Sequence, residues 1–336
     1  MKFRTTVETE MKGLHIHPGD GLTLLGSCFA DHIGRRMVQS GLDAHANPFG
    51  VLYNPLSIAV WCRAMATVEP LPEDIFFESG GLWHSWLNDS SFSAENREEC
   101  RTRLENVRRE EAARFRSLKV LFLTLGTNRY YRLNDNGRVV ANCHKQPGAR
   151  FTEEQLDVEG AKAVLGEALE ALWQVNPSLQ IVFTVSPYRY AKYGFHGSRL
   201  GKAVLLLAVD GICRAHEGRC FYFPAYEIVL DELRDYRFYA ADMLHPSEVA
   251  VEYIWERFSE VCFPAETRSF MAEWEAVAKA LSHRPLHPES AAYRDFLRQT
   301  MLKMERLTEK YPKLADTTEY GRLKDLLKYR GLCLIH

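Results

Sequence analysis

Three short segments of the chain carry residue types that could perform acyl-transfer chemistry. The first is Gly26-Ser27-Cys28, which follows the apolar residues 22–25 and precedes a helical pattern, so it reads as a strand-to-helix joint. Cys28 would then lie at a helix N-terminus, where free amides and the macrodipole would lower the thiol pKa or stabilise an oxyanion. A small cysteine packed in a tight turn is the alternative, and this motif alone favours that alternative.

The second segment is Asp242-Met243-Leu244-His245-Pro246. Its three-residue spacing allows the Asp242 carboxylate to accept a hydrogen bond from His245 Nδ1, which fixes the tautomer and leaves Nε2 as a general base. We expect Pro246 at the first position of a helix, so that His245 is held on a rigid start point. The same spacing also occurs by chance, which leaves a purely structural turn as the alternative.

The third segment is Gly126-Thr127-Asn128, which ends the apolar stretch 119–125. That stretch is the clearest candidate for a buried strand, because it is continuously apolar and rich in branched and aromatic side chains. Asn128 could therefore point into a cleft and donate to a developing oxyanion. An asparagine in a turn after a strand is the alternative.

Two further groups could bind substrate. Asn142, His144 and Lys145 follow a hairpin signal at Asn136-Gly137, and we expect them to line the cleft. Arg189 follows the predicted strand 180–185, and its loop suits a substrate hydroxyl or carboxylate. Loop charges in water are the alternative for Arg189.

Elements that could position these residues alternate along the chain: short apolar runs end in Gly, Ser or Pro, and longer segments have helical period. This pattern is typical of a mainly parallel sheet covered by helices, here with about four or five strands. The predicted helices include 29–39, 55–67, 96–117, 158–175 and 200–216.

Beyond Cys262 the pattern changes to charged helical segments with no strand between them, at 267–281, 288–310 and 317–329. We therefore predict an α/β domain over residues 1–262 and a helical extension over 263–336. The extension could pack on the α/β body or form a homodimer contact.

Composition excludes several classes of protein. The 336 residues include 42 Lys+Arg and 44 Asp+Glu, so there is no global charge to attract nucleic acid or an anionic membrane. No export signal or apolar run of about 20 residues is visible, which favours a soluble cytoplasmic protein. The 8 cysteines, with no C-x-x-C pair or H-E-x-x-H motif, indicate free thiols and no metal site.

Taken together, several blocks of the sequence resemble the GSCFA family. They include LLGSCFA, NPFG, TLGT, VVANCHK, TVSPYR and DMLHPS, and the resemblance spans roughly residues 21–263. The family is grouped with SGNH/GDSL-type hydrolases, which implies a flavodoxin-like three-layer α/β/α sandwich and acyl-ester chemistry. The chain departs from the family pattern at Tyr190, Ser198 and Gly201, where relatives carry His, Asn and Ser.

The resemblance also assigns residues. An ungapped match of Gly26-Ser27-Cys28-Phe29 to G-D-S-L puts Cys28 in the nucleophile position, and a one-residue shift of the turn would present Ser27 instead. Cysteine is the stronger nucleophile near neutral pH. Gly50, in the NPFG loop, resembles the SGNH block whose glycine amide completes the oxyanion hole.

We therefore expect an acyl-ester hydrolase, with a carbohydrate deacetylase as one form, that uses Cys28 or Ser27, His245 and Asp242 and needs no metal or cofactor. Its expected partner is a small-molecule or carbohydrate ester. Two alternatives stay open: an O-acyltransferase that uses the same acyl-enzyme, and a non-catalytic ligand-binding protein on a hydrolase scaffold.

Overall fold

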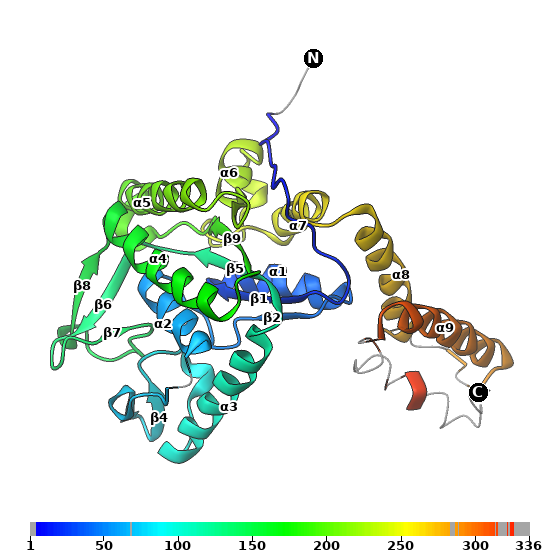
Figure 1. Ribbon diagram of the computed structural model, residues 1–336, viewed down its shortest axis with the longest axis horizontal. Coiled ribbons are helices and arrows are strands. Elements are labelled where there is room, and N and C mark those ends of the chain that lie inside the picture. The colour runs from blue at the N-terminus through cyan, green and yellow to red at the C-terminus, as the bar shows by residue number, and fades with distance from the viewer. Residues whose placement is uncertain are drawn as a thin grey trace. The chain divides into compact units, whose positions relative to one another are not determined.

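A computed structural model describes residues 5–67, 69–282, 286–287, 289–312, 314, 321 and 323–325. Within them, a five-stranded parallel sheet has the order β10-β9-β5-β1-β2 (Figure 1). Its strands are β1 (Gly21–Gly26), β2 (Ala44–Ala46), β5 (Leu118–Leu125), β9 (Gln180–Val185) and β10 (Cys220–Tyr222). Numbered within this sheet alone, the order is 2-1-3-4-5, which is the flavodoxin-like doubly wound arrangement. The predicted α/β fold is confirmed.

Helices cover both faces of this sheet. The helices of the α/β body are α1 (Cys28–Gln39), α2 (Pro55–Ala66), α3 (Arg97–Phe115), α4 (Val158–Val175), α5 (Gly194–Ala215), α6 (Ala225–Glu227) and α7 (Glu248–Cys262). Helices α2, α4 and α5 share one hydrophobic core with Leu121 and Leu123 of β5. Phe122 points to the opposite face, where its ring lies 5.6 Å from that of Phe258 on α7. The strand alternation thus builds two cores, one on each side.

Side-chain caps fix where several helices begin. Asn54, Asn96 and Asp157 each accept a hydrogen bond from a backbone N–H in the first turn of α2, α3 and α4. Each cap satisfies a donor that the helix itself leaves unpaired, which is why these polar residues precede the helical stretches. The bounds of α4 are those expected from the sequence.

Two small antiparallel sheets extend from the body. One pairs β3 (Phe76–Ser79) with β4 (Leu82–Ser85), and the other has the order β7-β6-β8, with β6 (Arg129–Leu133), β7 (Val139–Val140) and β8 (Phe151–Gln155). The hairpin expected around Asn136-Gly137 corresponds to β6 and β7. β3, β4 and β8 were not expected, because charged or polar side chains interrupt their apolar positions.

The chain divides into two compact units. Of the described residues, the first unit contains 5–14, 21–35 and 44–262, and the second contains those after 262 together with 15–20 and 36–43. In the second unit, α8 (Ala265–Ser282) and α9 (Ala291–Lys310) pack against each other. The predicted helix 317–329 lies largely outside the described residues.

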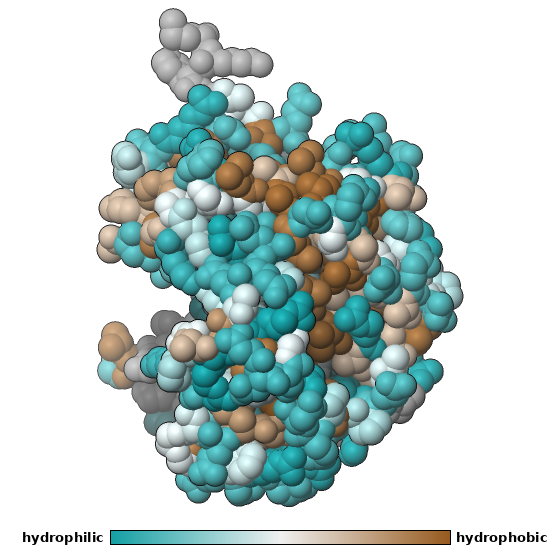
Figure 2. Space-filling view, turned by 90° about the vertical axis from the view of Figure 1, so that its left-hand side faces the viewer, coloured by the Kyte–Doolittle hydropathy of each residue, from teal (hydrophilic) through white to brown (hydrophobic). Residues whose placement is uncertain are grey.

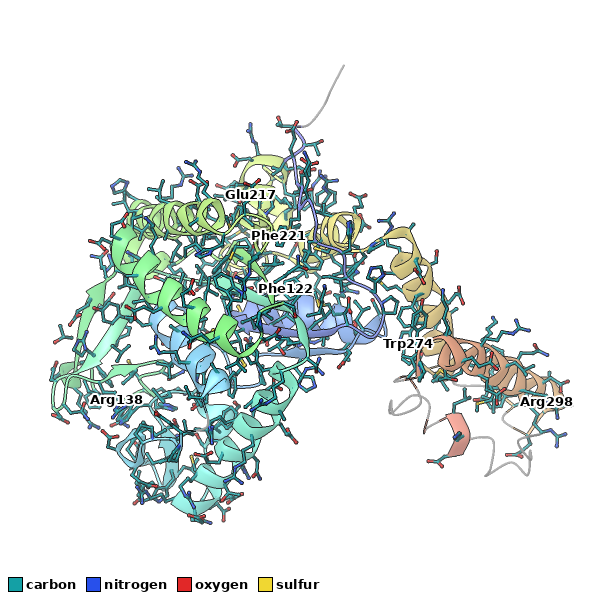
Figure 3. All side chains as sticks on the ribbon, in the orientation of Figure 1. Phe122, Arg138, Glu217, Phe221, Trp274 and Arg298 are labelled. Atoms are coloured by element: carbon teal, nitrogen blue, oxygen red, sulfur yellow. The ribbon has the colours of Figure 1, made fainter. Side chains whose placement is uncertain are left out.

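Aromatic side chains fill the interior of the α/β unit, and hydrophilic and hydrophobic groups mix on its surface. Figure 3 labels Phe122 and Phe221, which are 4% and 7% exposed, in the interior of the α/β unit. On the face shown in Figure 2, hydrophobic groups gather mainly in the upper half among hydrophilic ones. No helix within the described part of the chain has the length and apolarity needed to span a bilayer.

Candidate active site

The carboxyl end of β1 turns sharply into α1 at Gly26, Ser27 and Cys28. Gly26 has φ +146°, and a Cβ at this position would lie 2.2 Å from the carbonyl oxygen of Thr124 on β5, so the joint requires glycine. The Gly26 N–H donates to Asn47 Oδ1 at 2.8 Å. Since the strand order reverses between β1 and β5, the joint lies at the crevice where doubly wound sheets bind ligands.

Ser27 and Cys28 differ in accessibility. Ser27 is 1% exposed, and its buried hydroxyl has no hydrogen-bond partner among the described residues. Cys28 is a free thiol and is partly exposed. Of these two residues, only Cys28 is therefore partly accessible to solvent.

The electrostatic environment of the Cys28 thiol opposes its ionisation. Burial, followed by the charge of Asp31, raises the pKa of Cys28. Two backbone N–H groups at the start of α1 and the Lys202 charge act in the other direction but are outweighed. The expected lowering of this pKa is therefore wrong: the helix start is where the sequence placed it, but desolvation dominates. The thiol needs a base that takes its proton.

Three tyrosines lie close enough to Cys28 to respond to its charge. Burial is the main cause of the raised pKa of Tyr53, Tyr188 and Tyr190, and Cys28 contributes to each. For Tyr53 the pKa rises to about 12. The Tyr190 hydroxyl is buried and has no hydrogen-bond partner among the described residues. All three phenols therefore stay protonated near neutral pH and can donate.

The structure brings Asp242 and His245 together in one turn. His245 Nδ1 lies 2.5 Å from Asp242 Oδ2, and Asp242 Oδ1 accepts the backbone N–H groups of Leu244 at 2.9 Å and His245 at 3.0 Å. The backbone N–H of His245, and then its imidazole, lower the pKa of Asp242 to about 2. The carboxylate is thus ionised at neutral pH and fixes the His245 ring.

The turn is held differently from the expectation. Helix α7 begins at Glu248, and Pro246 instead forms an antiparallel bridge with Tyr239. The Ala240 N–H donates to the His245 carbonyl at 2.8 Å, so the two arms of the turn are bonded to each other. The prediction that Pro246 starts the helix is wrong, because the chain stays extended through this bridge.

Tyr188 links the turn with the thiol. Its ring centroid lies 4.2 Å from that of His245, and its pKa responds to both Asp242 and Cys28. Within the described chain, no hydrogen bond joins the His245 imidazole to Ser27 or Cys28, and its ring bonds only to Asp242. The histidine and the thiol thus share a neighbourhood without a direct bond.

A buried lysine supports the same edge of the sheet. Lys202 on α5 is 2% exposed, and its Nζ donates to the carbonyl oxygens of Gly126 at 2.6 Å and Ser186 at 2.7 Å. Burial, followed by the charge of Arg189, lowers the pKa of Lys202 to about 7. The ammonium ties together the residues that follow β5 and β9.

Asn128 and Gly50, the expected oxyanion donors, have their groups engaged in this structure. Asn128 Nδ2 donates to the Leu156 carbonyl at 2.7 Å, which leaves one of its two N–H groups. The Gly50 N–H donates to the Asn47 carbonyl at 2.8 Å within the NPFG turn. Asn128 could contribute to an oxyanion hole through its second amide hydrogen. Gly50 could do so only if its hydrogen bond to Asn47 broke.

Asn142, His144 and Lys145 lie in the turn after β7. The Asn142 side chain accepts the His144 N–H at 2.8 Å, and His144 Nε2 lies 2.9 Å from the Ser85 carbonyl oxygen. The His144 ring packs edge-on against Trp86. Burial lowers the pKa of His144. Lys145 is exposed. These contacts hold Asn142 and His144 against the β3–β4 hairpin and Trp86. That the three residues line the cleft stays a prediction.

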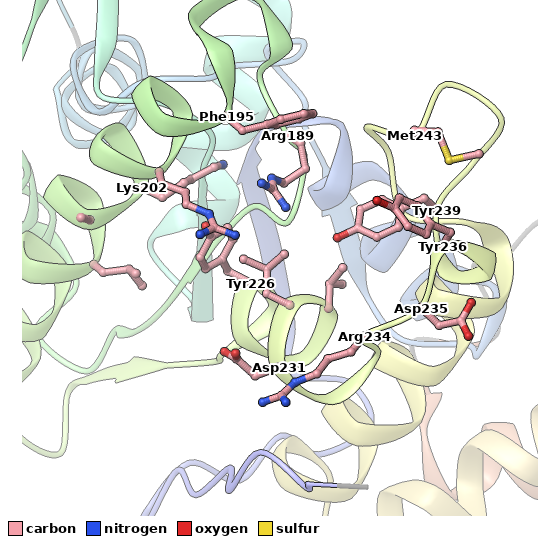
Figure 4. Close-up of a pocket in the computed structure, with 15 residues that line it drawn as sticks. Arg189, Phe195, Lys202, Tyr226, Asp231, Arg234, Asp235, Tyr236, Tyr239 and Met243 are labelled. Atoms are coloured by element: carbon pink, nitrogen blue, oxygen red, sulfur yellow. The ribbon is translucent and has the colours of Figure 1, made fainter.

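Arg189 lies beside the Asp242 turn. Its backbone N–H donates to the Leu244 carbonyl at 3.1 Å, and its guanidinium lies 5.1 Å from the Phe195 ring centroid. Arg189 also lines a cavity at this edge of the sheet (Figure 4).

Sequence reasoning missed Tyr53, Tyr188 and Tyr190 as neighbours of Cys28. The signal for two of them was present, since the segment 186–190 directly follows a buried strand. Lys202 shares helical spacing with Leu205, which is buried, so its charge falls on the buried stripe of α5.

Nothing in the described part of the chain forms a group of three or more His, Cys, Asp or Glu side chains placed to hold a metal. The seven cysteines that the structure describes are free thiols, and Cys333 lies outside the described residues.

Comparison with known proteins identifies the chain's relatives. A family model described as the GSCFA family matches residues 21–258, and one described as the GSCFA domain protein, C-terminal domain, matches residues 274–328. Among solved structures, an acetyl xylan esterase from the rumen bacterium Butyrivibrio proteoclasticus is similar at 12% identity with a TM-score of 0.38. That match covers 73% of this chain and 64% of the esterase chain. A search of curated proteins found no similar sequence.

Proposed function

Since the chain belongs to the GSCFA family, we propose that it is an SGNH-type acyl-ester hydrolase that acts on acylated carbohydrate with Cys28 as its nucleophile. The observation that carries the proposal is the neighbourhood of Cys28. A partly exposed thiol at the switch point of the sheet lies near Tyr188, whose ring is tilted by 41° against that of a histidine already paired with an ionised aspartate. A nucleophile, a base and a residue that orients the base are the parts that acyl transfer requires.

In the proposed reaction, His245 Nε2 takes the thiol proton as Cys28 Sγ attacks the acyl carbon. The tetrahedral intermediate collapses when His245 returns the proton to the leaving alcohol, which gives a thioester. Water, deprotonated by His245, then hydrolyses the thioester and regenerates the thiol. Asp242 holds the imidazole and stabilises its charged form throughout.

The developing oxyanion needs donors that are not already engaged. We assign this role to the Cys28 backbone N–H, at the start of α1, and to the Tyr190 hydroxyl. The buried Tyr190 hydroxyl has no partner among the described residues, and its pKa responds to Cys28, which supports its nearness to the reacting atoms.

The proposal is tested by hydrolysis of p-nitrophenyl acetate, and of acetylated xylose, by the full-length protein. Cys28→Ala and His245→Ala should abolish turnover, and Asp242→Asn should lower kcat by a factor of about 100 or more. Ser27→Ala is the matched control and should retain activity, because the Ser27 hydroxyl is buried. Unchanged turnover in Cys28→Ala with loss in Ser27→Ala would assign the nucleophile to serine. Release of p-nitrophenol only in the presence of an added sugar acceptor, with the acetyl group transferred to that sugar, would make the protein an acyltransferase.

A further inference from the structure

A cavity of about 740 Å³ lies next to the proposed site. Side chains from α5, from the segment after β10 and from the loop before His245 line it (Figure 4). The Arg189 N–H bond to Leu244 and the presence of Met243 in the wall join this cavity to the Asp242 turn. A ligand in the cavity would thus lie next to the proposed catalytic residues.

Three of the cations that line the cavity, Arg189, Arg199 and Lys202, lie near Tyr226; Lys202 is buried and Arg199 is exposed. Burial raises the pKa of Tyr226, but the charges of Arg189 and Arg199 act to lower it. Lys202 Nζ lies 5.9 Å from the Tyr226 ring centroid, and the Arg189 charge acts to lower the pKa of this lysine. The repulsion between these positive charges is unfavourable, and a bound anion would offset it.

No carboxylate among the described residues forms an ion pair with these three cations. Lys202 is bonded to two carbonyl oxygens, and Arg189 Nε is buried without a hydrogen-bond partner among those residues. A buried guanidinium nitrogen with no acceptor is costly, and a planar guanidinium is well matched to a carboxylate. The part of the cavity at Arg189 therefore suits an anionic group.

The outer wall has a different character. It carries the carboxylates of Asp231 and Asp235, the guanidinium of Arg234, and the phenols of Tyr236 and Tyr239. The carboxylates can accept hydrogen bonds from hydroxyl groups, and the phenols can both donate and accept them. Asp235 accepts the Arg237 N–H at 2.9 Å and keeps further acceptor sites. Such a wall suits a ring that bears several hydroxyl groups.

We propose that this cavity binds the carboxylate of an acidic sugar at Arg189 and its hydroxyl groups at the outer wall. This inference rests on the proposed function, and it makes the substrate an O-acylated saccharide that contains a uronic acid. The carboxylate would compensate the three cations, and the acyl ester would face Cys28 across the Asp242 turn.

The test is isothermal titration calorimetry of the full chain with glucuronate, its neutral methyl ester, glucose and inorganic phosphate. Glucuronate should bind at least about tenfold more tightly than glucose or the methyl ester, and Arg189→Gln should remove that preference. Arg214→Gln, on the same helix as Lys202 but ion-paired with Asp210 at 2.8 Å and 78% exposed, is the matched control and should bind normally.

Equal binding of glucose and glucuronate, or an undiminished preference in Arg189→Gln, would overturn the proposal. Phosphate binding as tight as that of glucuronate would overturn it too, since the site would then take any oxyanion. None of these binding measurements requires turnover. Failure of the binding proposal can therefore be distinguished from failure of the proposed function, which p-nitrophenyl acetate hydrolysis tests.

Discussion

At the Cys28 thiol, burial and the Asp31 charge work against the amides of α1 and the Lys202 charge, and the raised pKa shows that the first pair wins. A thiol of this kind is not a nucleophile by itself at neutral pH. The start of α1 does not ionise the thiol, so the proposed mechanism needs the His245 imidazole, fixed by Asp242, to take its proton. We therefore expect removal of the base to lower the rate more than it does in enzymes whose thiol is already ionised.

Tyr190 provides a prediction at the same scale. Replacing it by phenylalanine removes one proposed oxyanion donor and keeps the ring, so kcat for p-nitrophenyl acetate should fall by about 100-fold with little change in KM. Tyr193→Phe is the control, since this neighbouring tyrosine interacts with Tyr131 and Glu153 instead. A kcat that is unchanged in Tyr190→Phe would remove Tyr190 from the mechanism.

Lys202 makes stability depend on pH. Its pKa of about 7 in the folded chain lies below its ordinary value of 10.5. Below pH 7 both states hold the proton and folding bears the full cost of the buried charge. Between the two pKa values the unfolded chain binds more protons, so the free energy of unfolding rises with pH.

Urea unfolding of the wild type and of Lys202→Met isolates this effect. The difference in unfolding free energy should shift in favour of the wild type by roughly 2 kcal/mol between about pH 6 and about pH 9. The loss of the bonds to Gly126 and Ser186 adds a constant to the difference at every pH. A difference that does not vary with pH would show that the ammonium keeps its proton.

Cys28 and Tyr190 show which properties of single residues can be predicted from the sequence. The position of Cys28 after a strand followed from local pattern. Its pKa and its tyrosine neighbours did not, because they depend on segments far apart in the chain that only the fold brings together. Spacing rules are equally unable to predict the hydrogen bonds of Asn128 to Leu156 and of Gly50 to Asn47.

At the scale of elements, the strand-to-helix joint after β1 sets the position of the thiol. Gly26 combines a positive φ with a close approach to Thr124, so a side chain there is both strained and obstructed. The joint therefore depends on a single residue type.

Gly26→Ala should lower the free energy of unfolding by about 3 kcal/mol or more, because Cβ meets a backbone carbonyl that cannot move freely. Gly166→Ala, within α4, is the matched control: nothing lies within 4 Å of its added Cβ, and it should be neutral or slightly stabilising. Denaturant unfolding followed by circular dichroism measures both. Equal effects of the two substitutions would contradict the account of the joint.

Long apolar elements such as β5 and α4 were predictable because their patterns are strong and regular. β2 has three residues with no apolar run, and β8 carries charged side chains, so neither stood out from a loop. The start of α7 was misplaced because the bridge between Tyr239 and Pro246 overrides the local preference of proline for a helix start.

At the scale of the whole molecule, the second compact unit is not a simple C-terminal appendage. It includes residues 15–20 and 36–43, and within it Thr267 Oγ1 donates to the Ile16 carbonyl at 2.8 Å. A Cβ on Gly41 would lie 2.6 Å from the ring of Trp274, which is 2% exposed (Figure 3). Sequence pattern placed the boundary near Cys262 but gave no sign of these N-terminal contributions.

A chain that ends at Cys262 should therefore unfold at a lower temperature than the full chain and bind a hydrophobic dye, because Ile16 and Leu42 lose their cover. Trp274→Ala should act in the same direction, with a cost of about 3–5 kcal/mol. Leu302→Ala, at a side chain 42% exposed on α9, is the control and should change stability little. An unchanged melting temperature in the shortened chain would mean that the second unit contributes nothing to stability.

The most direct test of the central claim is intact-mass and peptide-mapping mass spectrometry of the full chain after brief reaction with p-nitrophenyl acetate at acidic quench. The account predicts one added acetyl group on Cys28, which hydroxylamine removes, and no acetylation of Cys28 in His245→Ala. Acetylation of Ser27, or equal acetylation of Cys28 with and without the His245 imidazole, would contradict it.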